Sequence, residues 1–202
     1  MVDWAAHQDD LMSKFLKDQD REPLNSSLPH IASVVQKAAS EEFDNVNLVS
    51  CALVLKDLIY IDFSPEKMRE FTPWNRCAFA DEGLLAGCYR TACGTEGIER
   101  ITVFPNKKAF LDVPQLTQRA EFIRNPDLKS LCVAPLVIGD SSIGSINISF
   151  RSELSDAQAA KVKLWLDEAA GSLKWLFYSE HIRLNNIWDM AQGLIASLQR
   201  RS

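Results

Sequence analysis

One long C-terminal helix constrains the fold of this 202-residue chain more than any other feature of its sequence. Ser155 and Gln158 form a capping box, and Asp156 occupies the first turn, where the helix dipole favours a negative charge. Apolar side chains then recur at heptad spacing up to Leu198, which predicts one continuous helix over residues 156–199. At 1.5 Å per residue this helix is about 66 Å long.

A domain of roughly 150 residues has a radius of gyration of about 15 Å, so it cannot bury such a helix along its whole length. The apolar repeat consists of Leu166, Ala170, Leu173, Phe177, Leu184, Ile187, Ala191, Leu194 and Leu198. Glu180 stands at the one position that should be apolar, and Gly171 weakens the helix by about 1 kcal/mol relative to alanine. The distal apolar side chains must therefore pack against the N-terminal helix, a second copy of the chain, or both. We predict a homodimer through the N- and C-terminal helices.

The N-terminal part of the chain contains two further helix signals. Residues 3–18 have the apolar spacing of an amphipathic helix. Residues 18–29 are polar, contain two prolines and are typical of a linker. The second helix is predicted over residues 28–43, with Ser27 as its N-cap and Pro29 in its first turn.

Strand signals follow directly. Val46–Leu55 is apolar at nearly every position, as expected for a strand that is buried on both faces. Leu58–Phe63 comes after only two residues, so the pair is predicted to form a hairpin. Ile98–Phe104 is a further strand, while Thr72–Phe79 has the composition of a loop.

A second hairpin is predicted between Ser130–Ile138 and Ile143–Phe150, joined by the four-residue loop Gly139–Ser142. The second strand alternates. One face carries Gly144, Ile146, Ile148 and Phe150, and the opposite face carries Ile143, Ser145, Asn147 and Ser149. The first set belongs to a core. The polar set lines a ligand pocket if it is buried, or faces water if it is exposed.

The element order is helix, two strands, an irregular middle, three strands and a long helix. This order predicts an α+β domain whose mainly antiparallel sheet is covered on one face by helices. Within residues 28–176 the sequence resembles the PAS-related GAF domain family. Two segments carry the resemblance: Glu82–Gly87, which is similar to the family's "eGlvG" turn into a helix, and Asn125–Phe150. The second segment matches the family pattern at Ser130, Leu131, Cys132, Val133, Pro135, Leu136, Gly139, Ile143, Gly144 and Phe150.

The resemblance implies a six-stranded antiparallel sheet with terminal helices on one face and a small-molecule pocket on the other. Ser145, Asn147 and Ser149 would then line the pocket, and the irregular middle of the chain would cover it. From that covering segment the ligand-binding candidates are Trp74, Arg76, Tyr89 and Thr91. GAF modules also dimerise through parallel helical bundles and pass signals to output domains.

Several known GAF chemistries do not fit these residues. The cyclic-nucleotide pattern begins at Asn106-Lys107 and Phe110, but Pro114-Gln115 stands where Asp-Glu is required. Bilin-binding members need a histidine beside the anchoring cysteine, and the three histidines of this chain lie at positions 7, 30 and 181. The identity of any cofactor is therefore left open.

The cysteines offer an alternative function. They lie at Cys51, Cys77, Cys88, Cys93 and Cys132. Cys51 and Cys132 fall in predicted strands and belong to the core. The other three fall in the covering segment near arginines, where an activated thiolate could perform redox chemistry, as in methionine-sulfoxide-reducing GAF enzymes. Their surroundings match no motif of those enzymes, and their spacing fits no common zinc pattern.

Composition narrows the choice of partners and compartment. The net charge is −5, with acidic and basic residues interspersed, which gives no electrostatic reason to expect nucleic acid or an anionic membrane as a partner. No apolar run approaches the ~20 residues of a membrane helix. An acidic N-terminal segment and an odd number of cysteines favour a cytoplasmic protein with reduced thiols.

No catalytic motif is present, so the sequence favours a non-enzymatic sensory module that binds a small molecule and relays a signal through a dimeric helical bundle. A thiol redox enzyme or sensor, and a dimerisation scaffold without a ligand, stay open as alternatives. The predicted units are an N-terminal helix and linker (1–24), a GAF-like domain (25–176) and a helical extension (177–202). The output partner is a further domain or a separate protein.

Overall fold

The computed structural model describes residues 2–17, 27–55, 58–63, 77–79, 101–111, 126–139 and 141–199. These residues form an α+β domain with an antiparallel sheet of six strands in the order β3-β2-β1-β6-β5-β4. The strands are β1 (Val46–Leu55), β2 (Leu58–Phe63), β3 (Cys77–Phe79), β4 (Thr102–Phe104), β5 (Ser130–Ile138) and β6 (Ser141–Phe150). The helices are α1 (Trp4–Lys17), α2 (Leu28–Glu42), α5 (Lys107–Leu111) and α7 (Asp156–Gln199).

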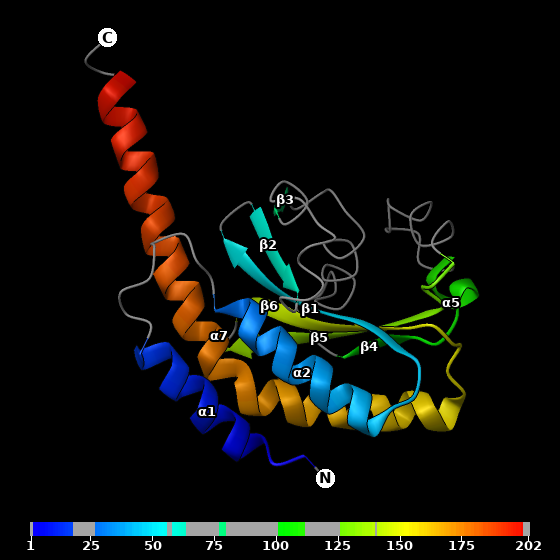
Figure 1. Cartoon of the computed structure of the whole chain (residues 1–202). Helices are drawn as coiled ribbons and strands as arrows, with labels where there is room; N and C mark the ends of the chain where they lie inside the picture. The colour runs from blue at the N-terminus through cyan, green and yellow to red at the C-terminus, as the bar shows by residue number, and fades with distance from the viewer. Residues whose placement is uncertain are drawn as a thin grey trace.

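Helices α2 and α7 cover one face of the sheet, and α1 packs beside α7 (Figure 1). The predicted α+β class and the placement of the helices on one face are therefore confirmed. Among the described residues, no helix is long and apolar enough to cross a membrane.

The core between sheet and helices follows the alternation of β6. Ile146, Ile148 and Phe150 are fully buried under the helices. An aromatic chain then leads outward from the sheet, through Phe43 against Phe150 (ring centroids 6.1 Å apart) and Phe43 against Trp165 (5.5 Å). Trp4 of α1 packs edge-on against Trp165 at 5.2 Å. These edge-to-face contacts join the sheet, α7 and α1 into one core.

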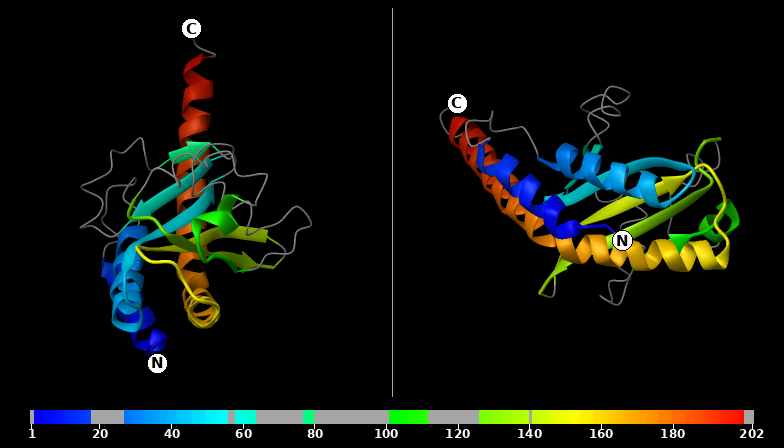
Figure 2. Two further views of the ribbon diagram at one scale, coloured as in Figure 1. Left: turned by 90° about the vertical axis from the view of Figure 1, so that its right-hand side faces the viewer. Right: turned by 60° about the horizontal axis from the view of Figure 1, so that its bottom comes forward.

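Helix α7 begins where its capping box predicts. The Ser155 N–H donates to Gln158 Oε1 at 2.9 Å, and the Gln158 N–H donates to Ser155 Oγ at 3.3 Å. The helix then runs over 44 residues and its C-terminal part extends beyond the sheet (Figure 2). Met190, Leu194 and Ile195 of this part are exposed.

Two local predictions are wrong, and a third is confirmed in position only. The loop of the second hairpin is shorter than predicted, because Ser141 and Ser142 already pair with β5 and a bulge in the register leaves Ile143 unpaired. Cys77–Phe79 is a strand rather than a loop, because it pairs with β2 at the sheet edge. Ser27 is the N-cap of α2 as predicted, with Pro29 in the first turn, but its side chain makes no capping hydrogen bond. Its backbone N–H instead donates to the Glu180 carboxylate of α7.

Gly144 is required by the close approach of β1 and β6. A Cβ at this position would collide with the carbonyl oxygen of Ala52, a backbone atom that cannot move without separating the two central strands. We predict that Gly144→Ala lowers the free energy of unfolding by about 1–3 kcal/mol, measured by urea denaturation. Gly193→Ala is the matched control, because a Cβ there meets nothing within 4 Å. It should leave stability unchanged or raise it by up to about 1 kcal/mol. Equal effects of both substitutions would contradict this role of Gly144.

Candidate functional site

The three polar residues of β6 are buried. Ser145 is 0% and Asn147 1% exposed, and Ser149 is also buried. They lie on the face of the sheet opposite the helices, because they alternate with Ile146 and Ile148 along the strand. The alternative that this face is solvated is therefore wrong. A buried polar row must be satisfied by hydrogen bonds, so its partners decide its role.

Two of these residues join a serine of β1 in a short hydrogen-bonded network. The Ser145 hydroxyl donates to Asn147 Oδ1 at 3.1 Å, and Asn147 Nδ2 donates to Ser50 Oγ at 3.2 Å. Ser50 and Asn147 are direct cross-strand partners in the β1–β6 register. We call Ser50, Ser145 and Asn147 the polar ladder.

The polar ladder holds more donor hydrogens than its own bonds use. The Asn147 amide carries two donor hydrogens and each serine hydroxyl carries one. Two of these four hydrogens are used within the ladder. Rotating the amide by half a turn exchanges the roles but uses the same number. Two donor hydrogens therefore remain, and the described residues offer them no further acceptor.

Ser149 is bonded differently from Ser145 and Asn147. Its hydroxyl donates to the backbone carbonyl oxygen of Leu48 at 3.3 Å, and its Oγ lies 3.5 Å from Asn47 Nδ2. It therefore ties β6 to the start of β1 and stands outside the polar ladder. Ser50 is the residue that sequence reasoning missed. The available signal was a single hydroxyl side chain in the middle of a strand that is otherwise apolar.

Apolar residues flank the polar ladder on both neighbouring strands. In the register, Ser145 lies between Ala52 and Pro135, and Asn147 lies between Ser50 and Val133. Ala52 and Val133 are buried. We call this face of β1, β5 and β6 around the polar ladder the floor of the candidate site. Its described residues are apolar with a few convergent polar groups and no charge, which is the usual composition of a small-molecule site.

The remaining predicted site residues cannot be placed against this floor. Trp74, Arg76, Tyr89, Thr91, Cys88 and Cys93 lie outside the described residues. The backbone of Cys77 lies in the edge strand β3, paired with Tyr60. Tyr60 in turn pairs with Leu53 of β1. The polar ladder lies at Ser50 and Ala52 of β1, so Cys77 is not in line with either position across the strands.

The two core cysteines behave as predicted. Cys51 and Cys132 are both buried in the hydrophobic core. Burial raises the pKa of the Cys132 thiol to about 12, because the apolar core disfavours the thiolate. Cys132 is therefore a structural residue and not a nucleophile at neutral pH.

The floor is connected to α7 through β1. His181 of α7 makes a hydrogen bond with the backbone of Val54, four residues along β1 from Ser50. Burial lowers the pKa of His181, and this hydrogen bond opposes part of that shift. Asn185 Nδ2 lies 3.0 Å from His181 Nε2. The strand that carries the serine of the polar ladder thus directly contacts the segment of α7 near which the helix leaves the domain.

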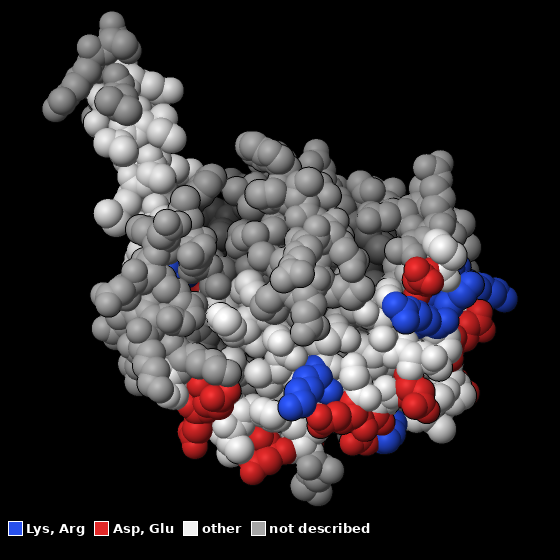
Figure 3. All heavy atoms as spheres, viewed as in Figure 1, with Lys and Arg blue, Asp and Glu red and all other residues white. Residues whose placement is uncertain are grey.

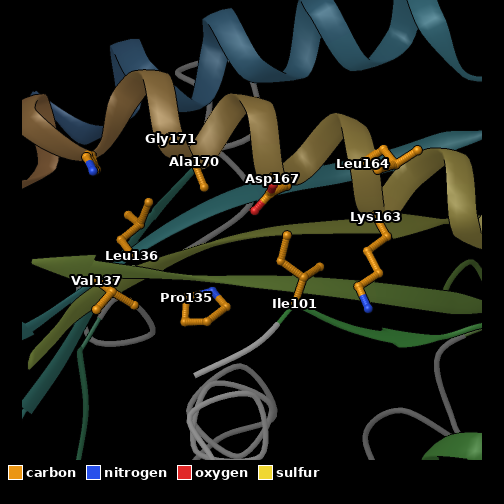
Figure 4. A pocket seen from close by; sticks show the side chains of 10 residues that line it. Ile101, Pro135, Leu136, Val137, Lys163, Leu164, Asp167, Ala170 and Gly171 are labelled. Atoms are coloured by element: carbon orange, nitrogen blue, oxygen red, sulfur yellow. The ribbon is translucent and has the colours of Figure 1, made fainter. Parts of the chain in front are cut away.

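A separate groove of about 550 Å³ lies between α7 and the edge of β5 (Figure 4). It is lined by Ile101, Pro135, Leu136, Val137, Lys163, Leu164, Asp167, Ala170, Gly171 and Lys174. No residue of the polar ladder lines it. In the part of the chain that the structure describes, no cluster of three His, Cys, Asp or Glu side chains could hold a metal ion. The surface seen in Figure 3 carries acidic and basic residues side by side, with no uniformly basic patch among the coloured residues.

Comparison with known proteins supports the fold. No protein-family model and no curated protein sequence matches the chain. Among solved structures, the GAF domain of an Acinetobacter phosphoenolpyruvate-protein phosphotransferase is 14% identical and covers 90% of this chain and 97% of its own, with a TM-score of 0.51. A putative GAF sensor protein from Burkholderia vietnamiensis is 12% identical (88% and 95% covered, TM-score 0.48). A free methionine-R-sulfoxide reductase from Thermoplasma acidophilum is 16% identical (72% and 94%, TM-score 0.46). The TM-score of 0.51 to the first of these structures shows that the chain has a GAF-like fold.

The polar ladder predicts a stability effect centred on Asn147. Asn147→Ala would leave the hydroxyls of Ser50 and Ser145 buried without their shared partner, which costs about 1–3 kcal/mol. The free energy of unfolding, measured by urea denaturation, should fall by that amount. Asn47→Ala is the control, because its hydrogen bonds are long and lie at the partly exposed end of the sheet. An Asn147 variant as stable as the Asn47 variant would show that the ladder is not buried as described.

Cys132 should resist alkylation in the native state. A thiol whose pKa is raised to about 12 is almost wholly protonated at pH 7, and it becomes reactive only when unfolding returns the pKa to its ordinary value. Peptide mapping after iodoacetamide treatment should therefore find Cys132 modified in denaturant but not in buffer. Rapid modification of the folded protein at Cys132 would contradict its placement in the core.

Proposed function

We propose that this protein is a cytoplasmic, non-enzymatic sensory module. It binds a small molecule on the face of the sheet that carries the polar ladder, and it relays binding through its terminal helices within a homodimer. The observation that carries this proposal is the ladder itself, which is buried and keeps two donor hydrogens beyond those its own bonds use. Buried donor hydrogens without an acceptor cost free energy, and a ligand that supplies an acceptor would remove this cost.

The chemistry of the floor narrows the ligand class. The described floor offers hydroxyl and amide donors between Ala52, Val133 and Pro135, and it offers no charged side chain. A ligand that places a carbonyl or similar uncharged acceptor over Asn147 and apolar surface beside it would match these groups. Burying a full negative charge there would require a cation that the described floor lacks.

The relay follows the connections of β1. A ligand held by Ser50 contacts the same strand whose Val54 backbone bonds His181 of α7. One residue earlier, Glu180 joins α7 to the start of α2. A ligand can shift α7 only by its differential affinity for two arrangements of the helix, so the relay requires two such arrangements. The exposed apolar side chains of the distal part of α7 are where an output partner would be contacted.

Ligand binding is tested on purified protein. Native mass spectrometry should find a retained small molecule, or a thermal-shift screen should find a compound that raises the melting temperature. The screen sets uncharged carbonyl compounds beside nucleotides, small organic acids and amino acids. The double variant Ser50→Ala with Ser145→Ala should weaken binding of that compound about tenfold, because it removes the spare serine hydroxyl that would donate to the ligand in either orientation of the Asn147 amide. Ser130→Ala is the matched control, since Ser130 is equally buried but its hydroxyl donates to the Ser152 carbonyl oxygen at 2.9 Å.

Two results would replace this proposal with an alternative. If no compound binds and the purified protein carries none, the chain is a GAF-like scaffold whose sheet face is filled by its own side chains. If Cys77, Cys88 or Cys93 is alkylated at pH 7 much faster than an ordinary cysteine, the thiol redox function becomes the better explanation.

A further inference from the structure

Helix α7 has a second apolar face that its own domain does not cover. We call it the outer stripe, and it consists of Leu164, Gly171, Trp175 and Ile182, with the half-buried Tyr178 at its border, where the ring also packs against the core. At 100° per residue these positions fall within about 40° of one line along the helix. The buried side chains of α7 lie on the opposite side, at Leu166, Leu173, Phe177 and Leu184. The outer stripe is therefore distinct from the core face and from its distal continuation.

The outer stripe exposes large apolar side chains. Leu164 is 73% and Trp175 56% exposed, and Ile182 is exposed as well. Trp175 packs edge-on against Tyr178 with ring centroids 6.0 Å apart, and Lys174 Nζ lies 5.7 Å from the Trp175 ring. Aromatic residues contribute most to binding at protein interfaces, and here an exposed tryptophan lies beside a half-buried tyrosine. The exposed Leu164 and Ile182 add apolar area to the same stripe.

The packing of a single chain does not explain why position 171 is a glycine. It lies in the interior of α7, where glycine destabilises a helix relative to alanine. A Cβ added there meets nothing within 4 Å, so the packing of this chain does not require glycine. A neighbouring helix that approaches closely at this point would require it.

The groove beside α7 adjoins the outer stripe. Leu164 and Gly171 belong to both, and the groove continues from them to Pro135 and Val137 on β5 (Figure 4). A helix lying along the outer stripe could thus also place side chains into the groove. The docking surface therefore consists of the outer stripe and the α7 side of this groove.

We propose that a second copy of this chain covers the outer stripe, with the two α7 helices antiparallel. The argument is self-complementarity. An antiparallel pairing sets Trp175 of one protomer over Gly171 of its partner, so that the large ring faces a position without a side chain. The same pairing sets Leu164 against the partner's Ile182, which is a contact between two apolar side chains. It also sets Glu168 beside the partner's Tyr178. A parallel pairing would instead oppose Glu168 to Glu168 at an apolar contact.

This inference sharpens the dimer of the proposed function but does not rest on ligand binding. It assigns the contact between copies to the outer stripe and leaves the exposed Met190, Leu194 and Ile195 in the distal part of α7 to an output partner. Ligand binding at the polar ladder can fail while the dimer stands, and the reverse also holds, so separate measurements distinguish the two.

The test is charge rescue at the Leu164–Ile182 contact, followed by sedimentation equilibrium of the full chain. The wild type is expected to be a dimer. Leu164→Asp and Ile182→Lys should each weaken the dimer about tenfold or more, because each places an unpaired charge in the contact. The double variant Leu164→Asp with Ile182→Lys should recover most of the affinity, because antiparallel helices bring opposite charges together at both ends of the contact.

Controls make each result decisive. Met190→Asp and Leu194→Asp change equally exposed apolar residues outside the outer stripe, and dimers should persist in both. Circular dichroism and thermal unfolding confirm that the variants fold, as expected for exposed positions. A monomeric wild type, or stripe variants that dimerise as strongly as the wild type, would overturn the proposal. Weakened single variants without rescue in the double variant would overturn the antiparallel pairing.

Discussion

The buried carboxylate of Glu180 joins the two helices that position the rest of the molecule. Its Oε2 accepts the Ser27 N–H at the start of α2 at 3.1 Å, and Arg183 donates to both of its oxygens at 3.0–3.1 Å. A buried carboxylate without such partners costs about 3–5 kcal/mol, so α2 and α7 are tied at this point. The negative charge also complements the helix dipole of α2, whose N-cap side chain makes no capping hydrogen bond.

The central strands β1 and β6 contribute side chains to both faces of the sheet. On the helix side, Val49 and Ile148 belong to the hydrophobic core. On the other side, Ser50 and Asn147 form the polar ladder. Because the same two backbones carry both sets, a change in strand spacing at the ladder must also be felt by the packing against α7. This sharing of strands, together with the bond from Val54 to His181, gives the sheet a direct mechanical connection to the long helix.

Local signals in the sequence predicted most of the secondary structure. The capping box at Ser155 set the start of α7 correctly, since both of its hydrogen bonds join residues three positions apart. The strand at Val46–Leu55 and the common face of Ser145 and Asn147 also followed from pattern and alternation, whereas alternation alone left the burial of that face open. The hairpin loop was misjudged, because pairing with β5 extends β6 back to Ser141. Local turn preference gives no measure of such pairing.

The length of α7, the α+β class and the polar row on β6 could be predicted from the sequence, because each depends on neighbours within a few residues. Three further features became visible only in the folded chain: Ser50 completes the ladder, Glu180 is buried, and the large side chains of the outer stripe are exposed. Ser50 meets Asn147 across 97 positions and Glu180 meets Ser27 across 153. Contacts over such separations arise from strand register and helix packing, which no local pattern of side chains encodes.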